Sequence, residues 1–227
     1  MSVEKVKVCL DLEIPPRGDE LALTKLWRNG TRLRVRFLNG ELPVQEKVRD
    51  YAKQWEQHAN ITFDFRDDPE AEIRIAFLSD GTSWSAVGTD ALNRVEFPDG
   101  GPTMNFGWLT RDSKEDEYSR VVLHEFGHAL GCIHEHQNPA GGIPWNVAAV
   151  YSYYATKGWP PQRVNTNILG RYEVDRTNYT AFDRESIMLY PIPGELTNGK
   201  LEVGWNLTLS PTDKRFISEK YPKPQPE

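Results

Sequence analysis

The sequence predicts an α+β fold with two lobes: a mixed twisted sheet with helices in the upper lobe, and an irregular, helical lower lobe. Two observations support this division. Up to about residue 135, segments that alternate apolar and polar residues are interleaved with segments of helical spacing, as expected for a sheet covered by helices. Residues 136–205 are instead rich in Gly, Pro, Asn, Tyr and Trp. This change in character places the boundary between the lobes near residue 135.

Four segments of the upper lobe have the alternation of half-buried strands. In the first, RLRVRF at 32–37, Leu33, Val35 and Phe37 share one face and three arginines share the other. The same alternation predicts further strands at ITFDFR (61–66), AEIRIAFL (71–78) and PTMNFGW (102–108).

Two helices are predicted in the same lobe. Apolar residues recur at helical spacing through VQEKVRDYAKQWEQHA, residues 44–59. The second helix follows Ser113 and Asp116, which have the spacing of a capping box, and we expect this helix to end at Gly131.

The lower lobe is expected to hold two more helices. The first begins after an Asn146 cap and extends up to Gly158. The last begins at Ser210-Pro211, with Asp213 in its first turn, and ends near Tyr221.

Composition narrows the class of protein. The chain has 227 residues, a net charge of −6 and dispersed basic residues, so we expect no nucleic-acid partner. No apolar run approaches the roughly 18 residues of a membrane span, so we expect no membrane association, and we expect a monomer. The first residues lack a continuous apolar stretch for export. This predicts a cytoplasmic protein, one exported without a leader, or one whose leader was removed.

The two cysteines, Cys9 and Cys132, are too few for a disulfide-stapled scaffold, so the hydrophobic core must stabilise the fold. The sequence leaves open whether these two cysteines pair with each other.

Four of the five histidines lie within HEFGHALGCIHEH, residues 124–136. His124 and His128 are four residues apart on the predicted helix, so both imidazoles reach one metal ion from the same face. Gly131 ends the helix in a turn, and His134 can then return as a third ligand. Three histidines with one open position are typical of catalytic Zn²⁺, and we predict one such ion per chain.

Glu125 lies next to the first ligand. We predict that it is the general base that activates a zinc-bound water and then carries the proton to the leaving amine. His136 is expected to lie outside the ligand set. The motif therefore predicts a zinc metalloendopeptidase, a hydrolase that cleaves internal bonds of peptide or protein substrates.

Two other interpretations of the motif compete with this one. A structural zinc site would normally have four protein ligands, mostly thiolates, which this motif does not offer. A zinc module that only binds a peptide or a partner protein would have no need of Glu125 beside the metal.

The histidine motif is followed by SIMLY at 186–190, and together they resemble the metzincin zinc peptidases, a superfamily defined by this motif and a downstream methionine turn. Met188 takes the place of the methionine in that turn. Tyr190 matches the pattern of astacins and serralysins, in which a tyrosine is an extra zinc ligand and stabilises the oxyanion.

The resemblance to astacins goes further. Glu135 directly follows the third histidine, as in astacins, where this glutamate lies near the buried N-terminal amine of the mature enzyme. KLWRNGTRLRVRF, residues 25–37, is similar to the opening of an astacin catalytic domain. The resemblance implies an active-site cleft between the two lobes and an edge strand that binds extended substrate, here PTMNFGW. The chain departs from astacins, which are secreted and carry two disulfides, in its two cysteines and its lack of a signal peptide.

The resemblance covers about residues 24–221, which we take as the catalytic domain, with an upper lobe to about 135 and a lower lobe at 136–221. Residues 222–227 are expected to form a disordered tail.

The remaining N-terminal segment, residues 1–23, has three candidate roles. It can pack as an additional strand of the sheet. Asp19, in Gly18-Asp19, can block the zinc as a Gly-Asp motif does in astacin zymogens. Cys9 can block it as a thiolate, as in other metzincins.

Overall fold

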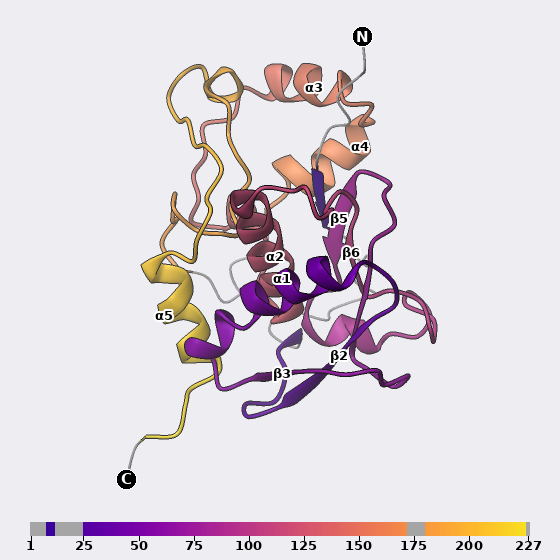
Figure 1. The fold of residues 1–227 in the computed structure, drawn as a ribbon. Coiled ribbons are helices and arrows are strands. Elements are labelled where there is room, and N and C mark those ends of the chain that lie inside the picture. The colour runs from indigo at the N-terminus through magenta and orange to yellow at the C-terminus, as the bar shows by residue number, and fades with distance from the viewer. Residues whose placement is uncertain (1–7, 12–24, 172–179, 226–227) are drawn as a thin grey trace.

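The computed structural model describes residues 8–11, 25–171 and 180–225 (Figure 1). A mixed sheet of six strands, in the order β1-β5-β6-β4-β2-β3, forms its centre. Neighbouring strands are parallel except for β5 and β6, which are antiparallel. The strands are β1 (Val8–Asp11), β2 (Arg32–Phe37), β3 (Thr62–Phe65), β4 (Ile73–Ala76), β5 (Thr82–Ser85) and β6 (Met104–Phe106).

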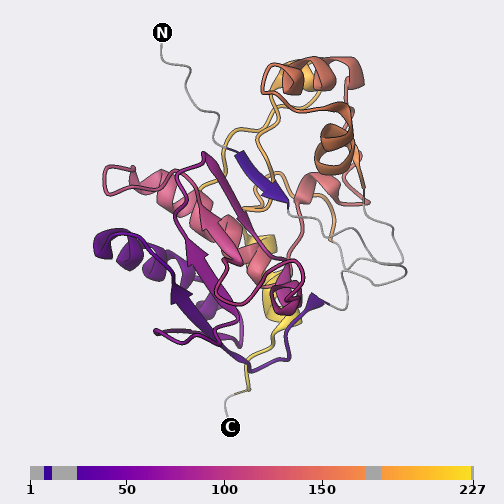
Figure 2. The same ribbon diagram turned by 90° about the vertical axis from the view of Figure 1, so that its right-hand side faces the viewer.

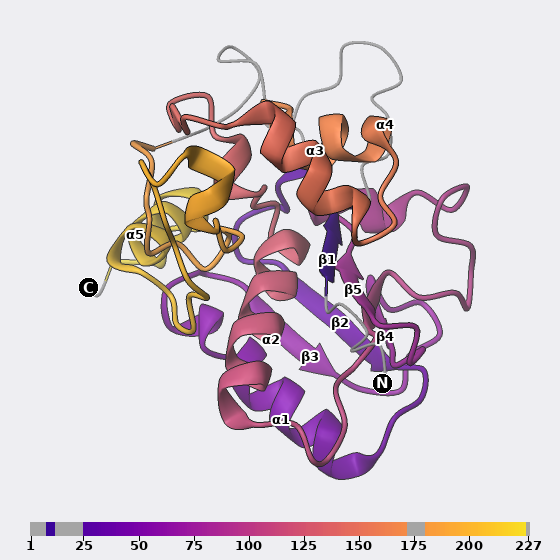
Figure 3. The same cartoon turned by 90° about the horizontal axis from the view of Figure 1, so that it is seen from above.

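Two helices cover one face of the sheet, and the others belong mostly to the second lobe. Seen from above, α1 and α2 lie across β2 and β3, while α3 and α4 lie beyond β1 (Figure 3). No helix in the described part of the chain is long and apolar enough to span a bilayer. The helices are α1 (Leu42–Ala52), α2 (Glu115–Ala129), α3 (Val147–Ala155), α4 (Pro161–Val164) and α5 (Pro211–Lys220). Short helical turns are η2 (Trp55–Gln57), η3 (Gly88–Leu92), η4 (Glu135–Gln137), η5 (Asn165–Leu169) and η7 (Gly194–Thr197).

The apolar face of the sheet forms the core with these helices. Leu33 and Val35 of β2 are fully buried, as their alternation predicts. Phe63 of β3 meets Phe126 of α2 edge to face, with ring centroids 4.9 Å apart. Contacts of this kind hold α2, which carries the histidine motif, against the sheet.

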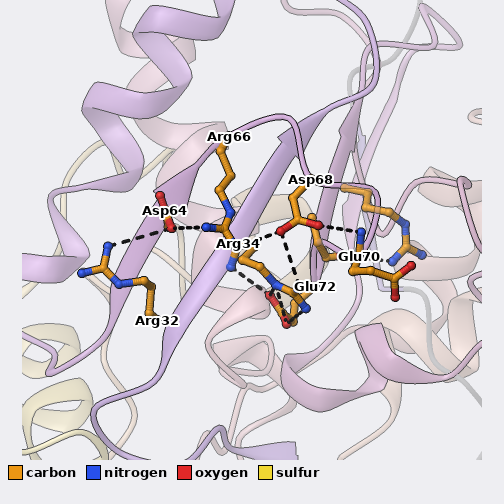
Figure 4. Close-up of polar contacts among 9 residues, drawn as sticks. Arg32, Arg34, Asp64, Arg66, Asp68, Glu70 and Glu72 are labelled. Atoms are coloured by element: carbon orange, nitrogen blue, oxygen red, sulfur yellow. Dashed lines mark hydrogen bonds and ion pairs between the residues drawn. The ribbon is translucent and has the colours of Figure 1, made fainter.

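The opposite face of β2 and β3 carries a row of alternating charges (Figure 4). Its centre is Arg34, whose backbone N–H and side chain both donate to the carboxylate of Glu72, with Nη2 2.5 Å from Oε1. Asp68 lies at 3.4 Å from Nη1 of the same arginine. The strictly alternating sequence thus separates an apolar core face from a charged outer face.

The strand predicted at 32–37 is confirmed residue for residue, and the other three predicted strands are present in shorter form. The helix predicted at 44–59 is wrong in its length, because α1 ends at Ala52 and η2 follows. After Lys53, backbone donors bond three residues back instead of four, as Gln54 N does to Tyr51 O. Trp55 is thereby directed into the core, where its indole N–H donates to Leu123 O at 3.0 Å.

The capping box predicted for α2 is wrong. The N-cap is Lys114, without a side-chain cap, and the Ser113 hydroxyl instead accepts from Thr110 N in the preceding turn. Glu115, with the two acidic residues that follow it, places negative charge in the first turn, which stabilises the helix by interaction with its dipole.

The predicted substrate edge is also wrong. PTMNFGW forms β6, which lies inside the sheet between β5 and β4. The antiparallel strand beyond it is β5, which the sequence analysis did not predict because TSWS is too short and too polar for a clear alternation. β1 is the edge strand on this side of the sheet and pairs in parallel with β5, and it lies between β5 and the α3–α4 region (Figure 2).

The predicted helices of the lower lobe are confirmed. Asn146 caps α3 by accepting from Ala149 N, although this helix ends at Ala155. Ser210 and Asp213 form a complete capping box at the start of α5.

The ends of the chain are described in part. In the expected tail, Pro222 O accepts from Asn29, and Lys223 donates to Gln57 O. Residues 226–227 and Asp19 lie outside the described residues.

Candidate metal centre

The last turn of α2 is held by side chains from distant parts of the chain. The Trp27 indole N–H donates to Ala129 O at 2.8 Å, and the Tyr221 hydroxyl donates to Leu130 O at 2.7 Å. Carbonyls at the end of a helix have no partner within it, so these bonds satisfy them in a buried region. They also fix the end of α2, after which the chain turns back to place His134 beside the other two histidines.

The side chains of His124, His128 and His134 converge on one point. Their Nε2 atoms form a triangle with sides of 3.1–3.2 Å, and all three residues are buried. In a tetrahedral site with Zn–N distances of about 2.0–2.1 Å, ligand nitrogens lie about 3.3 Å apart. The spacing of the three imidazoles therefore fits zinc.

Backbone carbonyls orient two of these imidazoles. His124 Nδ1 lies 2.8 Å from Ile187 O, and His128 Nδ1 lies 2.8 Å from Cys132 O. A carbonyl accepts only from N–H, so Nδ1 carries the proton and the Nε2 lone pair faces the centre. Burial lowers the pKa of His124 well below its usual value, and the neighbouring imidazoles lower it further, which favours the neutral ligand form.

Gly131 makes the turn that brings His134 to its partners. Its φ is +95°, a conformation that favours glycine, and its N–H donates to His128 O at 2.8 Å. A Cβ at this position would also lie 2.9 Å from Leu26 Cδ2. The predicted role of this glycine as the end of the helix is confirmed.

The turn at 186–188 connects the metal centre to α5. Asp213 accepts from the Ser186 hydroxyl at 2.7 Å and from Ile187 N at 2.8 Å. On the other side, Ile187 O accepts from His124, and Met188 O accepts from Glu135 N at 3.0 Å. One short turn thus positions the first ligand and the residue after the third.

Aromatic rings surround the third ligand. The Tyr190 ring lies 4.3 Å from that of His134 and 5.8 Å from that of His124, between centroids. His136 stacks on Tyr190 at 4.8 Å, and its Nε2 lies 2.7 Å from Asn167 O. Since Nε2 of His136 faces this carbonyl, His136 lies outside the group of three histidines that could share a metal among the described residues.

Glu125 is fully buried on the turn of α2 between the first two ligands. Its position in the sequence places it beside His124, where the predicted base must lie.

A pocket beside the metal centre is lined by His134, Glu135 and Met188, among others. Glu135 faces it and accepts from Asn138 Nδ2 and Asp183 N, each at 2.9 Å. Burial raises the pKa of Glu135 to about 7, and the charges of Asp183 and Asp213 add to this, although the two hydrogen bonds oppose it.

Cys132 also lines this cavity and is a free thiol, so a Cys9–Cys132 bridge is not formed in this structure. Burial raises the pKa of this thiol, which keeps it protonated and unreactive.

Two parts of the site were missed from sequence. The contact of Asp213 with the 186–188 turn was not expected, although Asp213 was predicted in the first turn of the last helix. A cavity beside Arg120 and Trp205 was not expected either, and these two residues, 85 positions apart, carry no motif that links them.

The comparisons with known proteins agree with this geometry. The sequence model of the matrixin family, Peptidase_M10, matches residues 35–149, just over half of the chain. The chain belongs to the matrixin family. The match begins within β2 and includes β3, β4, β5 and β6, all of α2 and the complete histidine motif.

Individual proteins are similar to this matrixin over different lengths. A structure of myroilysin has 42% sequence identity, covers 90% of this chain and 99% of its own, and superposes with a TM-score of 0.86. A crystal structure of myroilysin has 41% identity, coverage of 97% and 93%, and a TM-score of 0.72. High choriolytic enzyme 1, a hatching enzyme zinc-protease from Oryzias latipes (Medaka fish), shares the fold at 17% identity, with coverage of 87% and 94% and a TM-score of 0.60.

A curated relative is similar over a shorter stretch. Matrix metalloproteinase-2 of Drosophila melanogaster is 28% identical over 133 residues, which are 51% of this chain. The matched part spans only 17% of the length of that relative.

Together, the family, the fold and the three histidines confirm the prediction of a metzincin. The matrixin is a metalloprotease-type hydrolase, and its three-histidine centre is a catalytic zinc site.

Proposed function

We propose that this matrixin is a zinc-dependent endopeptidase that cleaves internal bonds of peptides and proteins, with Glu125 as general base. The observation that carries the proposal is the convergence of three imidazole Nε2 atoms within 3.2 Å, with Glu125 buried on the same helical turn. A module that only binds peptide would need the histidines but not this carboxylate.

The residues divide the reaction among them. Zinc, when bound, supplies a Lewis acid that polarises the scissile carbonyl and acidifies water. Glu125 takes a proton from the attacking water and later delivers it to the leaving amine. The hydroxyl of Tyr190 donates a hydrogen bond to the carbonyl oxygen as negative charge develops on it. The contact of the Tyr190 ring with His134 supports this role, because it holds the phenol beside the ligands.

An extended substrate would pair with β5. This strand is the outer member of the antiparallel pair, and an added strand would pair with the edge of β5 that faces away from β6. In this structure β1 occupies that edge, with Val8 opposite Thr82 and Asp11 opposite Ser85. We therefore extend the proposal to latency: residues 1–23 compete with substrate for the edge of the sheet.

We further propose that the chain is astacin-like in how it holds its N-terminus. The support is the cavity beside Glu135, where three carboxyl groups gather around a space that would suit a buried ammonium group. An N-terminal amine produced by cleavage of the segment before residue 24 is the group that the resemblance implies.

Cleavage of a proteome-derived peptide library, with and without a chelator, tests the function. We expect internal cleavages that the chelator abolishes. Glu125→Gln should keep zinc and the fold but lose nearly all cleavage, since an amide cannot accept the proton. Glu46→Gln, an exposed change on α1, serves as the control. Cleavage by Glu125→Gln within a few-fold of the native chain would exclude Glu125 as the base.

A further inference from the structure

A series of hydrogen bonds leads from the first zinc ligand to the buried carboxylate of Asp213 on α5. His124 Nδ1–H donates to Ile187 O at 2.8 Å. The peptide group that carries this oxygen also carries Met188 N–H, which donates to the Ser186 hydroxyl oxygen at 3.1 Å. That hydroxyl in turn donates to Asp213 Oδ1 at 2.7 Å. Three hydrogen bonds and one peptide group therefore connect the imidazole with a carboxylate from a different helix.

The hydrogen bonds of this series all point toward Asp213. Met188 N–H can only donate, so the Ser186 oxygen accepts there and its own hydrogen is left for the carboxylate. Asp213 Oδ2 accepts from Ile187 N at 2.8 Å and from Ser210 N at 2.9 Å. Burial raises the pKa of Asp213, and the hydrogen bonds from these three donors oppose that rise. Donors on both oxygens favour the charged form of the carboxylate.

The whole series lies in the interior of the protein, because His124, Ser186, Ile187 and Asp213 are all buried. Hydrogen bonds in such a low-dielectric region polarise one another, so a negative charge at one end strengthens the bond at the other. A stronger acceptor at Ile187 O fixes the plane of the His124 ring and draws on its Nδ1 proton, which leaves more electron density on Nε2. Partners of this kind raise the basicity of a histidine ligand and hold it in the orientation that the metal requires.

We propose that Ser186 and Asp213 are positioning residues of the zinc centre, which orient His124 and strengthen it as a ligand through the peptide group between Ile187 and Met188. Asp213 also belongs to the capping box of α5, so the start of that helix and the first zinc ligand are coupled. Zinc binding is measured without substrate, so this role can be tested independently of the proposed endopeptidase function.

Competition with a chromophoric chelator at neutral pH measures the zinc affinity of the native chain and of two variants. Ser186→Ala removes the hydroxyl between Met188 N–H and the carboxylate but leaves the bond from Ile187 N to Asp213. We expect the Kd for zinc to rise about 10- to 100-fold, as is usual when a partner that orients a histidine ligand is removed. Asp213→Asn keeps the shape of the side chain but removes its charge, and should also weaken zinc binding.

Ser210→Ala is the matched control, because it removes a buried hydroxyl at the start of α5 that lies outside the series. The Ser210 hydroxyl accepts from Asp213 N and donates to Asp183, whereas the backbone N–H of Ser210 still donates to Asp213 in the variant. Loss of this cap should lower the stability of the zinc-free protein in urea. The Kd for zinc should stay at the native value. A purely structural role of Ser186 would give the same result in Ser186→Ala.

Three results would overturn the inference. Native zinc affinity in Ser186→Ala would show that the hydroxyl does not act on His124. Native affinity in Asp213→Asn, with weaker binding in Ser186→Ala, would show that the charge of Asp213 is not responsible. An equal loss of affinity in Ser210→Ala would show a general loosening of this region. If Asp213→Asn does not fold by circular dichroism, the comparison of Ser186→Ala with Ser210→Ala decides the matter.

Discussion

Gly127 lies directly against the side chain of Met188, with no room for a methyl group between them. A Cβ at position 127 would lie 2.4 Å from Met188 Sδ and 3.2 Å from Trp55 Cζ2. The glycine is the residue before His128 on α2, so the methionine side chain packs against the helix backbone beside a zinc ligand. Because Gly127 has no Cβ, the 186–188 turn can lie close to the part of α2 that carries His124 and His128.

Gly127→Ala should therefore destabilise both the fold and the metal site. Overpacking of this kind costs about 1–3 kcal/mol, and we expect that loss in urea unfolding, with weaker zinc binding in a competitive titration. Gly204→Ala is the control, because nothing lies within 4 Å of a Cβ at that position. An unchanged free energy of unfolding would show that Met188 moves aside without cost.

His128→Ala should lose most of its zinc, because two remaining imidazoles rarely hold the ion tightly at neutral pH. Elemental analysis after dialysis should find about one zinc per native chain and little in the variant. His136→Ala is the contrast: its imidazole faces Asn167 O, so this variant should keep zinc. Full zinc in His128→Ala would remove His128 from the ligand set.

Tyr190→Phe should bind zinc normally but turn over more slowly. A lost oxyanion donor acts on the transition state, so we expect kcat to fall about 10- to 1,000-fold with little change in KM. Tyr151→Phe, whose hydroxyl donates to Asn165 in the second lobe, is the control. If only KM rises, Tyr190 is a binding or packing residue.

Deletion of residues 1–23 should raise kcat/KM at least several-fold, because it removes β1 from the edge of β5. Zinc content and circular dichroism establish that the shortened chain is folded. In the full-length chain, Asp19→Ala and Cys9→Ser then show whether either side chain blocks the metal. Equal activity with zinc and fold intact would contradict latency and leave β1 as a structural strand.

The Arg34–Glu72 pair should make stability depend on pH (Figure 4). Burial raises the pKa of Glu72, but hydrogen bonds from Arg34 and its charge outweigh this, so the pKa in the folded protein lies below its ordinary value of 4.5. A carboxylate whose pKa is lower in the folded protein than in the unfolded chain stabilises the fold at pH values above its unfolded-state pKa. This stabilisation is lost as the pH falls through its folded-state pKa.

Glu72→Gln should therefore lower the free energy of unfolding by about 1–2 kcal/mol at pH 7, since several charge-assisted bonds are weakened. The difference from the native chain should shrink as the pH falls below 4.5. Asp67→Asn is the control, because its carboxylate pairs with Arg36 while 84% exposed. A difference that stays constant from pH 7 to pH 3 would show that the charge of Glu72 is not responsible.

The sequence by itself determined the elements whose cause is local. Two histidines four residues apart share a helix face whatever the rest of the chain does, and Gly131 supplies a conformation that other residues adopt only with strain. Alternation in RLRVRF likewise separates a core face from a charged face within six residues. The metal ligands and the strand could be predicted because each depends on the geometry of a single segment.

Local signals were weaker at the ends of elements. The first helix tightens after Ala52, and the start of α2 has no side-chain cap, because contacts such as that of Trp55 with Leu123 O decide where the chain turns. Helical spacing indicates only which residues face the core. A continued helix would bury Trp55 just as the tighter turn does, so the spacing does not distinguish the two.

Only the tertiary structure decided how distant segments complete the site. The turn at 186–188 meets His124 across 63 residues, and Asp213 reaches that turn from another helix. The outer position of β5 and the pairing of Arg120 with Trp205 follow from strand order and from how α2 packs against the loop after β-bridge residue Val203. Such contacts depend on which surfaces meet when the core closes, and no periodicity within one segment encodes that choice.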